Sequence, residues 1–571
     1  MSAASARWLA ALAALLAGAL ALRVWGIDHG LPFVYNADEN AHFVARAIGM
    51  FGHSYNPGYF INPPGFTYLI HAVFALRWGS REAVGTAFAT DPTDAYVIAR
   101  TLSALLGTAA VGLLAWAGAR MFDRATGLIA GLVFAVAYLP VFYGHFALND
   151  VPTLAPVCLA LLGAAGVLRT GRLPWFAVAG AGIGLGAATK YTGGLTVLCL
   201  LAAAAVAERA SVRRRVLGVV LAGAVALGAF LVANPFALLD FDAFRDGLTK
   251  QSETAAEAGS KLGLGDESGL AYYVRSLTWG LGWVPALAAL GGAVALALRD
   301  RRAALVLLPA PLLFALFMGS QGRFFARWLL PVYPVLALLA AVGARQLATM
   351  LAGRVRPAWT LAAAALVLAA QGALHSVHGS AVMARADTRQ LARGWMVEHV
   401  PEGAKVVVEP VFPDQWASDP GRPSAVTGNG NRWRKWPTSR SQVNNDGTLR
   451  KGPGRIVKLE DYERTTRPEL VQAYLRGGYC WVVTGSTQYG RAYADPGEVP
   501  QALRYYAALK RAGDVVFRAS PWKPGATGPR FSFDFSFNTY PLAYARPGPE
   551  IVVYRLRGGQ CSGRALPSRE T

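Results

Sequence analysis

The stretch ARTLSALLGTAAVGLLAWAGARMFDRATGLIAGLVFAV, residues 99–136, decides the fold. It contains most of two apolar runs, Ala95–Ala119 and Ala125–Tyr143, and each approaches the roughly 20 residues that a helix needs to cross a bilayer. A short loop with Arg120 and Arg124 separates the two runs. Apolar runs joined by short basic loops are typical of membrane proteins that cross the bilayer several times. The stretch therefore predicts a bundle of membrane-spanning helices.

The composition of the whole chain agrees with this interpretation. Of the 571 residues, 54% are hydrophobic and only 16% are charged, whereas soluble domains carry about 25% charged residues. The apolar runs stop near His375, and residues 385–571 have the composition of an ordinary globular domain that can form its own core. We therefore predict a polytopic α-helical membrane domain over residues 1–384, with an outer loop at 28–94, and an exported α/β domain over 385–571.

Eleven apolar runs are candidate membrane spans, which places the two termini on opposite sides. The basic clusters between spans favour a cytoplasmic N-terminus, although the short spans between Pro174 and Ala233 leave the count there ambiguous and one of them could be re-entrant. Pro63–Trp78 is short and begins with two prolines, so we expect a helix at the outer surface rather than a crossing. The candidate spans are Trp8–Ile27, Ala95–Ala119, Ala125–Tyr143, Val151–Leu168, Pro174–Thr189, Tyr191–Ala207, Val216–Ala233, Ser276–Leu298, Ala303–Met318, Ala326–Val342 and Ala358–Leu374.

The distribution of charge and the cysteine pattern argue against two classes of function, nucleic-acid binding and zinc binding. The formal net charge is +21, but much of the positive charge in the apolar part lies in short loops between spans, which argues against a nucleic-acid partner. The chain has no CxxC pair and no HExxH motif, so a zinc site is not expected. Cys480 and Cys561 both lie in the predicted exported domain, where a disulfide can persist, and the sequence leaves open whether they are paired.

The acidic pair Asp38 and Glu39 lies in VYNADENAHFVARA, residues 34–47, in the first polar segment after the N-terminal apolar run. In a helix that starts near Asp38, His42 and Arg46 share its face at i+4 and i+8. A carboxylate, an imidazole and a guanidinium at a water–lipid boundary suit an anionic substrate with a lipid tail. The alternative is that Asp38 caps the helix, that Glu39 favours the helix dipole, and that the two other side chains are solvated.

Four further charged residues are candidates for chemistry. Asp150 precedes a span and is either functional or a helix cap. Lys190 interrupts apolar sequence at a turn, where it can hold a phosphate or reach lipid headgroups. Arg323 and Arg327 lie in a short outer loop, against the positive-inside tendency, and this suggests a partner anion or headgroup contacts.

Several of these segments together resemble bacterial GT-C glycosyltransferases of family 39, which include protein O-mannosyltransferases and lipid A aminoarabinose transferases. The resemblance runs in order from about Val34 to Met350. The segments that carry it are DEN-AHFVARAI, NPPGFTYLIHAVFAL, the stretch quoted first, HFALNDVPTLAPVCLALL, ATKYTGGL and RFFARWLLPVYP.

The resemblance implies an inverting enzyme that moves one sugar from a polyprenyl-phosphate carrier to a glycan, lipid or protein acceptor. It implies a site on the outer face of the bacterial inner membrane, with the exported domain on the same side. Asp38 matches the acid proposed as catalytic base, Glu39 matches its partner, which supports the base or the acceptor, and Asp150 matches a second outer-loop acid.

The phosphate contacts are a looser part of the resemblance. Lys190 and the pair Arg323 and Arg327 fall where contacts to the carrier phosphate are expected. Some family members have a basic residue directly after the acidic pair, where this chain has Asn40. Arg46, His42 or Lys190 are the candidates to replace it.

Two questions about function stay open at this stage. A divalent cation (Mg, Mn or Ca) could assist the leaving phosphate, with Asp38 and Asp150 as its candidate ligands. The competing functions are a secondary transporter, which usually has internal repeats and ionisable groups near the membrane centre, and an oligosaccharide ligase with a lipid pyrophosphate donor. The exported part contains no WWDYG-like motif typical of the latter group.

The exported part has alternating helix and strand signals, which predict a small α/β domain. Its polar segment 427–455 contains Trp433 and Trp436, which we expect either to stack on sugar rings or to sit among headgroups. The predicted elements are helices Thr388–Val400, Glu469–Leu475 and Val499–Arg511, and strands Lys405–Glu409, Tyr479–Val483, Val515–Arg518 and Ile551–Leu556.

Overall fold

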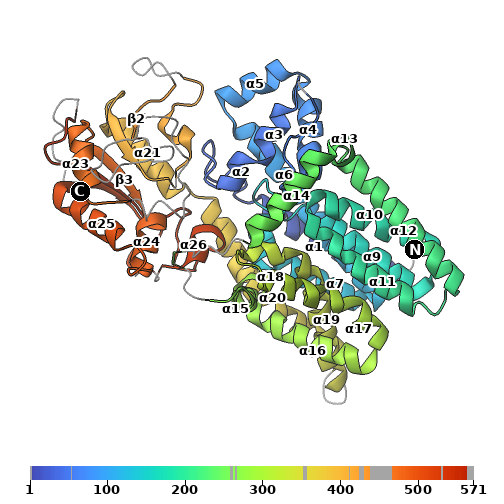
Figure 1. Ribbon diagram of the computed structural model, residues 1–571. Helices are drawn as coiled ribbons and strands as arrows, with labels where there is room; N and C mark the ends of the chain where they lie inside the picture. Colours follow the sequence, from blue (N-terminus) through green and yellow to red (C-terminus); the bar gives the residue numbers. More distant parts are fainter. Residues whose placement is uncertain are drawn as a thin grey trace.

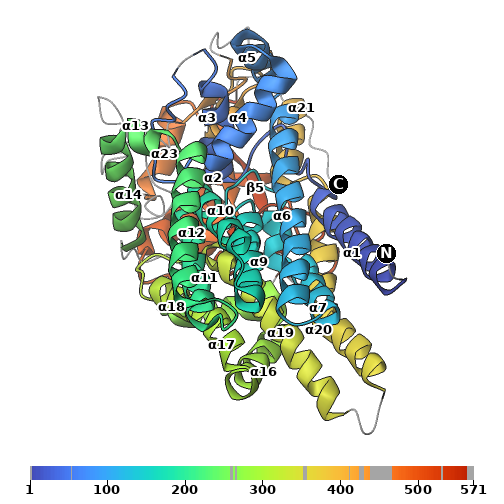
Figure 2. The same ribbon diagram turned by 90° about the vertical axis from the view of Figure 1, so that its right-hand side faces the viewer.

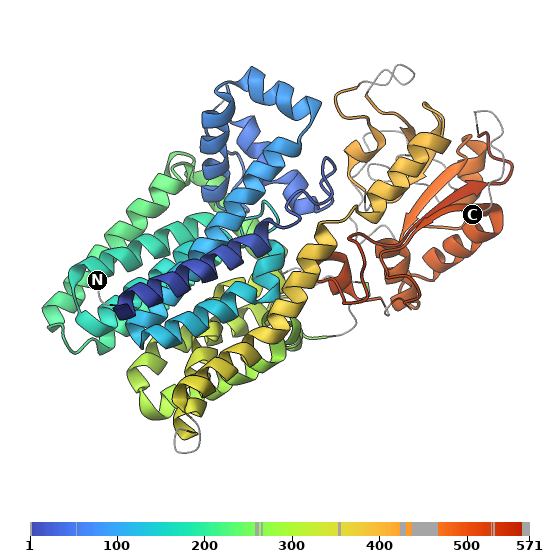
Figure 3. The same ribbon diagram turned by 180° about the vertical axis from the view of Figure 1, so that it is seen from behind.

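A computed structural model of the chain has two parts, a helical bundle and a smaller α/β unit beside one end of it (Figure 1). Helix α20, Pro357–Met383, leads from the bundle into the α/β unit (Figure 3). The predicted fold class, a polytopic helical protein with a C-terminal α/β domain, is confirmed. The structure describes residues 3–52, 54–256, 262–263, 267–351, 356–410, 412–422, 430–436, 466–526, 528 and 531–561.

Each predicted span corresponds to an apolar helix or a short series of helices in the described residues. Seven of these are long and apolar enough to cross a membrane, and four are shorter, at 10–17 residues. The helices are α1 Ala3–Val24, α6 Thr93–Met121, α7 Arg124–Val136 with α8 Tyr138–Tyr143, α9 Leu154–Thr170, α10 Leu173–Thr189, α11 Val197–Val206 after the 3₁₀ turn Tyr191–Thr196, α12 Val212–Ala233, α15 Gly269–Leu277 with α16 Trp283–Arg299, α17 Arg301–Leu307 with α18 Pro309–Gly319, α19 Tyr333–Met350 after the 3₁₀ turn Ala326–Val332, and α20.

Glycines let α9, α10 and α12 pack closely. A Cβ atom added to Gly182 would lie 2.4 Å from the backbone nitrogen of Ala160 on α9, and one added to Gly184 would lie 2.1 Å from the carbonyl oxygen of Ala226 on α12. Only glycine permits backbone approach this close, which is a common device where membrane helices pack.

Contacts at the two ends of the bundle remove the ambiguity in the span count. At one end, Arg169 Nη2 lies 3.7 Å from Asp300 Oδ2, and Arg209 Nη1 donates to the Arg169 carbonyl at 3.1 Å. At the other end, Lys190 forms an ion pair with Asp150. Helices α9, α10, α11 and α12 therefore alternate in direction, and the re-entrant segment considered for this region is not present.

The segment between α1 and α6 forms a group of short helices above one end of the bundle (Figure 2). The helix expected at Pro63–Trp78 is present as α4 and packs on α3 rather than joining the long apolar helices. The four helices are α2 Ala37–Ala41, α3 Phe43–Gly49, α4 Gly65–Trp78 and α5 Arg81–Thr90.

The α/β unit is built on a five-stranded sheet with strand order β2-β1-β3-β5-β4. Strand β1 pairs in parallel with β2 and β3, whereas β5 pairs antiparallel with β3 and β4. The elements are α21 Thr388–His399, β1 Lys405–Val408, β2 Arg434–Lys435, α23 Glu469–Arg476, β3 Trp481–Gly485, α24 Ser486–Ala494, α25 Pro500–Ala512, β4 Gly513–Ala519, α26 Phe533–Phe537 and β5 Ile551–Leu556.

Both faces of the sheet are covered, because successive side chains along a strand point into two different cores. Val406 and Val408 pack with α21, whereas Val407 between them packs with α23 and α25. The predicted helices and strands of this part are therefore present, with ends shifted by a few residues. The short elements α24, α26 and β2 were not predicted.

The expectation for the two tryptophans was wrong. Trp433 is fully buried in the core beside α21, and Trp436 is 5% exposed in the core on the opposite face of the sheet. Neither ring is available to a sugar or to lipid headgroups. The rest of segment 427–455 lies largely outside the described residues.

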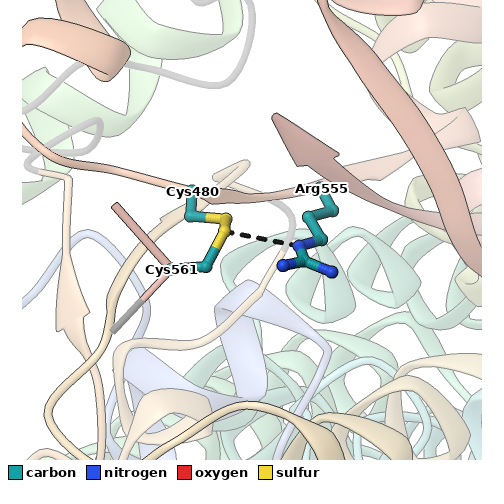
Figure 4. Close-up of a disulfide and its surroundings, with 3 residues drawn as sticks. All are labelled: Cys480, Arg555 and Cys561. Carbon is teal, nitrogen blue, oxygen red and sulfur yellow. Dashed lines mark hydrogen bonds between the residues drawn. A yellow bond between two sulfur atoms is a disulfide. The ribbon is translucent and has the colours of Figure 1, made fainter. Parts of the chain in front are cut away.

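A disulfide joins Cys480 to Cys561, and Arg555 on β5 lies beside it with Nε 3.4 Å from the Cys561 sulfur (Figure 4). The bond closes a loop with a sequence separation of 81 residues, and it ties the chain after β5 to the start of β3. Of the two possibilities left open by the sequence, the structure therefore has the paired one.

Replacing both cysteines by serine is expected to lower the stability of the α/β unit by about 2–4 kcal/mol, because the unfolded chain regains the freedom of a long loop. Limited proteolysis of the full chain over a temperature series measures this change. A reducing agent should have the same effect on the wild type and none on the double variant. Equal protease resistance of both proteins in oxidising and reducing buffer would contradict a stabilising disulfide.

The α/β unit contacts the bundle through α26 and the residues after it. Asp534, which is 2% exposed, accepts a hydrogen bond from the Tyr272 hydroxyl at 2.7 Å. Asn538 accepts one from the Tyr143 hydroxyl at 2.6 Å. Because Tyr143 and Tyr272 belong to the bundle, these buried polar contacts fix the α/β unit to the end that carries Asp150 and Lys190.

Candidate active site

Asp38 lies in the first turn of α2, in the group of short helices above the bundle. Asn36 is the helix cap, because its side-chain oxygen accepts the backbone N–H groups of Asp38 and Glu39, both at 3.1 Å. The alternative in which Asp38 itself caps the helix is therefore wrong. The Asp38 carboxylate is 43% exposed and is not used in capping the helix.

Asp150 and Lys190 lie on neighbouring loops that the bundle brings together. Their side chains, 5% and 15% exposed, form an ion pair. The adjacent residue Asn149 donates to the Thr189 carbonyl at 2.8 Å and ties the two loops together. Helix α9 begins only at Leu154, so Asp150 is not its cap.

Arg327 stands between the two carboxylates. Its guanidinium donates a hydrogen bond to Asp38, and its Nε lies 3.8 Å from Asp150 Oδ2. Its guanidinium carbon also lies 5.8 Å from the centre of the ring of Tyr143. The hydroxyl of Tyr143 in turn donates a hydrogen bond to Asn538 of the α/β unit. Two carboxylates and two cations from four distant parts of the sequence thus meet at one point.

The charges around Asp38 keep it ionised. Burial among protein atoms by itself raises the pKa of Asp38, but Arg327 above all, and then His42 at the acid pH where it is protonated and Arg323, outweigh this effect and hold that pKa below its ordinary value. A carboxylate that is ionised at neutral pH has the form that a general base requires.

His42 lies near Asp38, as the i+4 spacing predicts, with its Nε2 3.9 Å from Asp38 Oδ1, and it shares an aromatic contact with Arg46. Both contact the ring of Tyr59: His42 stacks on it at 5.1 Å between centroids, and the Arg46 guanidinium carbon lies 3.9 Å from its centre. Burial lowers the pKa of His42 although Asp38 raises it, so the imidazole is neutral at pH 7. A neutral imidazole lacks the charge expected of a phosphate ligand. Arg323, by contrast, carries a positive charge that helps to lower the pKa of Asp38.

Glu39 is engaged elsewhere, although it is adjacent to Asp38 in the sequence. Its fully buried carboxylate accepts Arg100 Nε at 2.8 Å and Nη2 at 2.9 Å, and it also accepts the Ala147 backbone N–H at 2.7 Å. With both oxygens bound in this way, Glu39 is placed to position the loops rather than to touch a substrate.

Two residues of this arrangement were missed from the sequence. Arg100 is an isolated charge inside an apolar run, and such charges in membrane helices usually have a partner. The sequence therefore contained a signal from which a buried partner for Arg100 could have been predicted. Tyr143 gave no signal, because a tyrosine at the end of an apolar run is common at membrane interfaces.

The residues present do not form a site for a divalent cation. Asp38 and Asp150 are the candidate ligands, but the Arg327 guanidinium pairs with both of them. Among the described residues, no group of three or more His, Cys, Asp or Glu side chains is placed to hold a metal ion. Arg327 thus occupies the place that a metal ion would need between Asp38 and Asp150.

Comparisons with known proteins find one family match and several solved structures with a similar fold. Residues 62–236 match the family model of dolichyl-phosphate-mannose-protein mannosyltransferase, a segment that includes Asp150 and Lys190 but neither Asp38 nor Arg327. No curated protein sequence matches the chain significantly.

Solved structures share the fold over most of the chain. ArnT from Cupriavidus metallidurans, bound to undecaprenyl phosphate, has a TM-score of 0.51 and 14% identity, with 97% of this chain and 98% of that chain covered. The archaeal oligosaccharyltransferase AglB from Archaeoglobus fulgidus, in complex with an inhibitory peptide and a dolichol-phosphate, has a TM-score of 0.50 and 13% identity, with 93% and 75% covered. The chain is therefore similar to dolichyl-phosphate-mannose-protein mannosyltransferases over residues 62–236, and over most of its length it shares the fold of ArnT and AglB.

Proposed function

We propose that the protein transfers one sugar, with inversion, from a polyprenyl-phosphate carrier to an acceptor on the outer face of the membrane. The observation that carries this proposal is the position of Arg327, between Asp38 and the Asp150–Lys190 pair. A carboxylate base and cations for a phosphate are the two groups that this reaction needs. The lipid phosphates bound by ArnT and AglB support a donor of the same class.

Asp38 is the general base in this proposal. The acceptor hydroxyl attacks the anomeric carbon, the bond from that carbon to the phosphate oxygen breaks, and the electron pair leaves with the phosphate. Asp38 takes the hydroxyl proton as the new bond forms. Attack from the side opposite the leaving phosphate inverts the anomeric centre.

Arg327 and Lys190 stabilise the negative charge on the leaving phosphate. Without donor, Arg327 neutralises Asp38 and lowers its basicity. A bound phosphate competes for the same guanidinium, so donor binding loosens the ion pair and raises the pKa of the base. The site thereby couples donor binding to activation of Asp38. Asp150 holds Lys190 in place.

The proposed topology follows from the ends of the bundle. The arginine-rich loops share one end, and Asp150, Lys190 and the α/β unit share the other. With basic loops in the cytoplasm, the site and the C-terminal unit lie outside the cell, in the setting of a bacterial inner membrane.

A transfer assay tests this function. The purified full chain in lipid nanodiscs is incubated with undecaprenyl-phosphate sugars and candidate acceptors, and mass spectrometry follows the loss of the donor. NMR of the product gives its anomeric configuration. Turnover of a lipid pyrophosphate donor alone would favour the oligosaccharide ligase. Movement of a lipid-linked or free sugar across vesicles without any bond cleavage would favour a transporter.

Lys190→Ala is expected to raise the apparent KM for the donor by at least about tenfold, because a charge-assisted contact to the phosphate contributes about 1.5–3 kcal/mol. The value of kcat should change less. Lys250→Ala is the matched control, because Lys250 is an exposed lysine on α14, Phe241–Ala256. Lys190→Arg should recover most of the donor affinity. An unchanged donor KM in Lys190→Ala would remove this residue from the phosphate site.

A further inference from the structure

The α/β unit contains a cavity of about 300 Å³ between the start of α24 and the segment that includes α26. Ligand sites have volumes of roughly 300–1,000 Å³, so this one suits a small ligand. The lining is mainly aromatic, with six side chains: Tyr489, Trp522, Phe531, Phe535, Tyr540 and Tyr544. Trp522 and Tyr544 pack edge to face, with ring centres 4.7 Å apart.

Several polar atoms of the lining residues have no hydrogen-bond partner within the described part of the chain. These are the indole nitrogen of Trp522, the hydroxyls of Tyr540 and Tyr544, and the hydroxyl of Thr487. Buried or half-buried groups of this kind are normally paired. They are therefore available to a ligand that carries several hydroxyl groups.

The charged groups of the cavity are already paired, which argues against an ionic ligand. The Glu550 carboxylate accepts from Arg518 Nη1 at 2.8 Å and from the Tyr489 hydroxyl. Arg389 makes two hydrogen bonds to Asp387, at 2.8 and 2.7 Å. Among the described lining residues Arg389 has no second cation beside it, as Arg327 has Lys190, so this cavity suits a neutral sugar, which can use aromatic faces and hydroxyl contacts, better than a phosphate.

The cavity lies next to the candidate active site. Arg389, Phe535 and Tyr540 also line a smaller neighbouring cavity of about 60 Å³, and Asn36 and Arg100 line that cavity as well. Asn36 caps the helix that carries Asp38, and Arg100 holds Glu39. A chain of sugars that starts in the larger cavity is thus directed toward the catalytic helix.

We propose that this cavity binds a sugar unit of the acceptor, so that the acceptor is a glycan. The assignment rests on the proposed glycosyltransferase function. Trp522 and Tyr544 supply the faces for a neutral sugar ring, and the unpaired hydroxyl and indole groups bind its hydroxyls. The α/β unit is then the part of the enzyme that selects the acceptor, while the bundle holds the donor.

Binding of simple sugars to the full chain in nanodiscs tests the cavity without any donor. The probes are the methyl glycosides of mannose, glucose, galactose and arabinose, and saturation-transfer NMR measures their binding. We expect saturable binding of at least one glycoside, at least tenfold weaker in Trp522→Ala and intermediate in Trp522→Phe, which keeps an aromatic face but loses the indole nitrogen. Tyr493→Ala, a half-exposed tyrosine on the same helix α24, is the control and should bind like the wild type.

A kinetic measurement separates binding of the acceptor from a structural role. In Trp522→Ala the KM for a glycan acceptor should rise at least tenfold, while the KM for the donor shifts less than twofold. The absence of saturable binding to any of the four glycosides overturns the inference, as does equal binding by Trp522→Ala and wild type. Sugar binding without any donor-dependent transfer contradicts the proposed function and the acceptor assignment together. Transfer without sugar binding contradicts the cavity assignment alone.

Discussion

Asp38→Asn is expected to lower kcat for sugar transfer by about 10²–10⁴-fold, the usual contribution of a positioned general base. Asparagine has nearly the same shape as aspartate but cannot accept the proton of the acceptor hydroxyl. Because the substitution also frees Arg327 from its ion pair, the donor KM should stay the same or fall. Steady-state transfer in nanodiscs, with donor and acceptor varied separately, measures both constants.

Asp28→Asn provides the matched control, because Asp28 is an exposed aspartate in the same outer loop. It should leave kcat within about twofold of wild type. Donor binding by Asp38→Asn, measured without acceptor, should be at least as tight as in the wild type. Retention of a large part of the wild-type kcat by Asp38→Asn would remove Asp38 as the base.

The pH dependence provides a second readout for Asp38. The pKa of Asp38 in the free enzyme is held below the ordinary value of about 3.9. The midpoint of the acid-side loss of kcat/KM should therefore lie below that value, because this constant reports the free enzyme. In the donor complex the phosphate draws Arg327 away, the pKa of the base rises, and the acid limb of kcat should lie at higher pH. Coincident limbs would contradict the coupling between donor binding and base activation.

The membrane part of the fold could be predicted from the sequence because a bilayer imposes a simple requirement. Each crossing needs a long apolar run, and the runs along this chain correspond to the observed helices. The pairing of Asp150 with Lys190 could not be predicted, because it depends on how α9 and α10 pack. The sequence places both residues at span ends but contains no information on their distance.

The different roles of the adjacent residues Asp38 and Glu39 could not be predicted from the sequence pattern. Successive helical residues point about 100° apart, so neighbours in sequence face different surroundings. One carboxylate meets Arg327, and the other is fully buried against Arg100. Both carry the same local signal, and only the tertiary contacts separate a chemical role from a positioning role.

Short elements rich in polar and aromatic residues could not be predicted from the sequence pattern either. Helix α26 has five residues, FDFSF, whose alternation of apolar and polar residues has the period of a strand and not that of a helix. It is held in place by Tyr143 and Tyr272 of the bundle, so its conformation depends on contacts between the two parts. The burial of Trp433 likewise depends on the sheet around it.

The Glu39–Arg100 pair joins α2 to α6 and fixes two further segments near the site. Glu39 binds the Ala147 backbone N–H, which belongs to the loop that carries Asp150. Arg100 Nη1 donates to the carbonyls of Ile27 and His29, at 2.8 and 2.9 Å, in the segment that follows α1. Because one buried ion pair connects α2, α6 and the Asp150 loop, it determines where Asp38 lies relative to Arg327.

Glu39→Gln is therefore expected to destabilise the protein by about 3–5 kcal/mol, because it leaves the Arg100 charge buried without its partner. Thermal unfolding of the full chain in nanodiscs measures the loss. The double variant Glu39→Gln with Arg100→Gln should regain part of the stability, since it removes the unpaired charge as well. A direct catalytic role predicts the opposite combination: Glu39→Gln would keep wild-type stability and lose kcat, and the second substitution would restore nothing. Only the positioning role links the two residues through stability, so the recovery in the double variant decides between the roles.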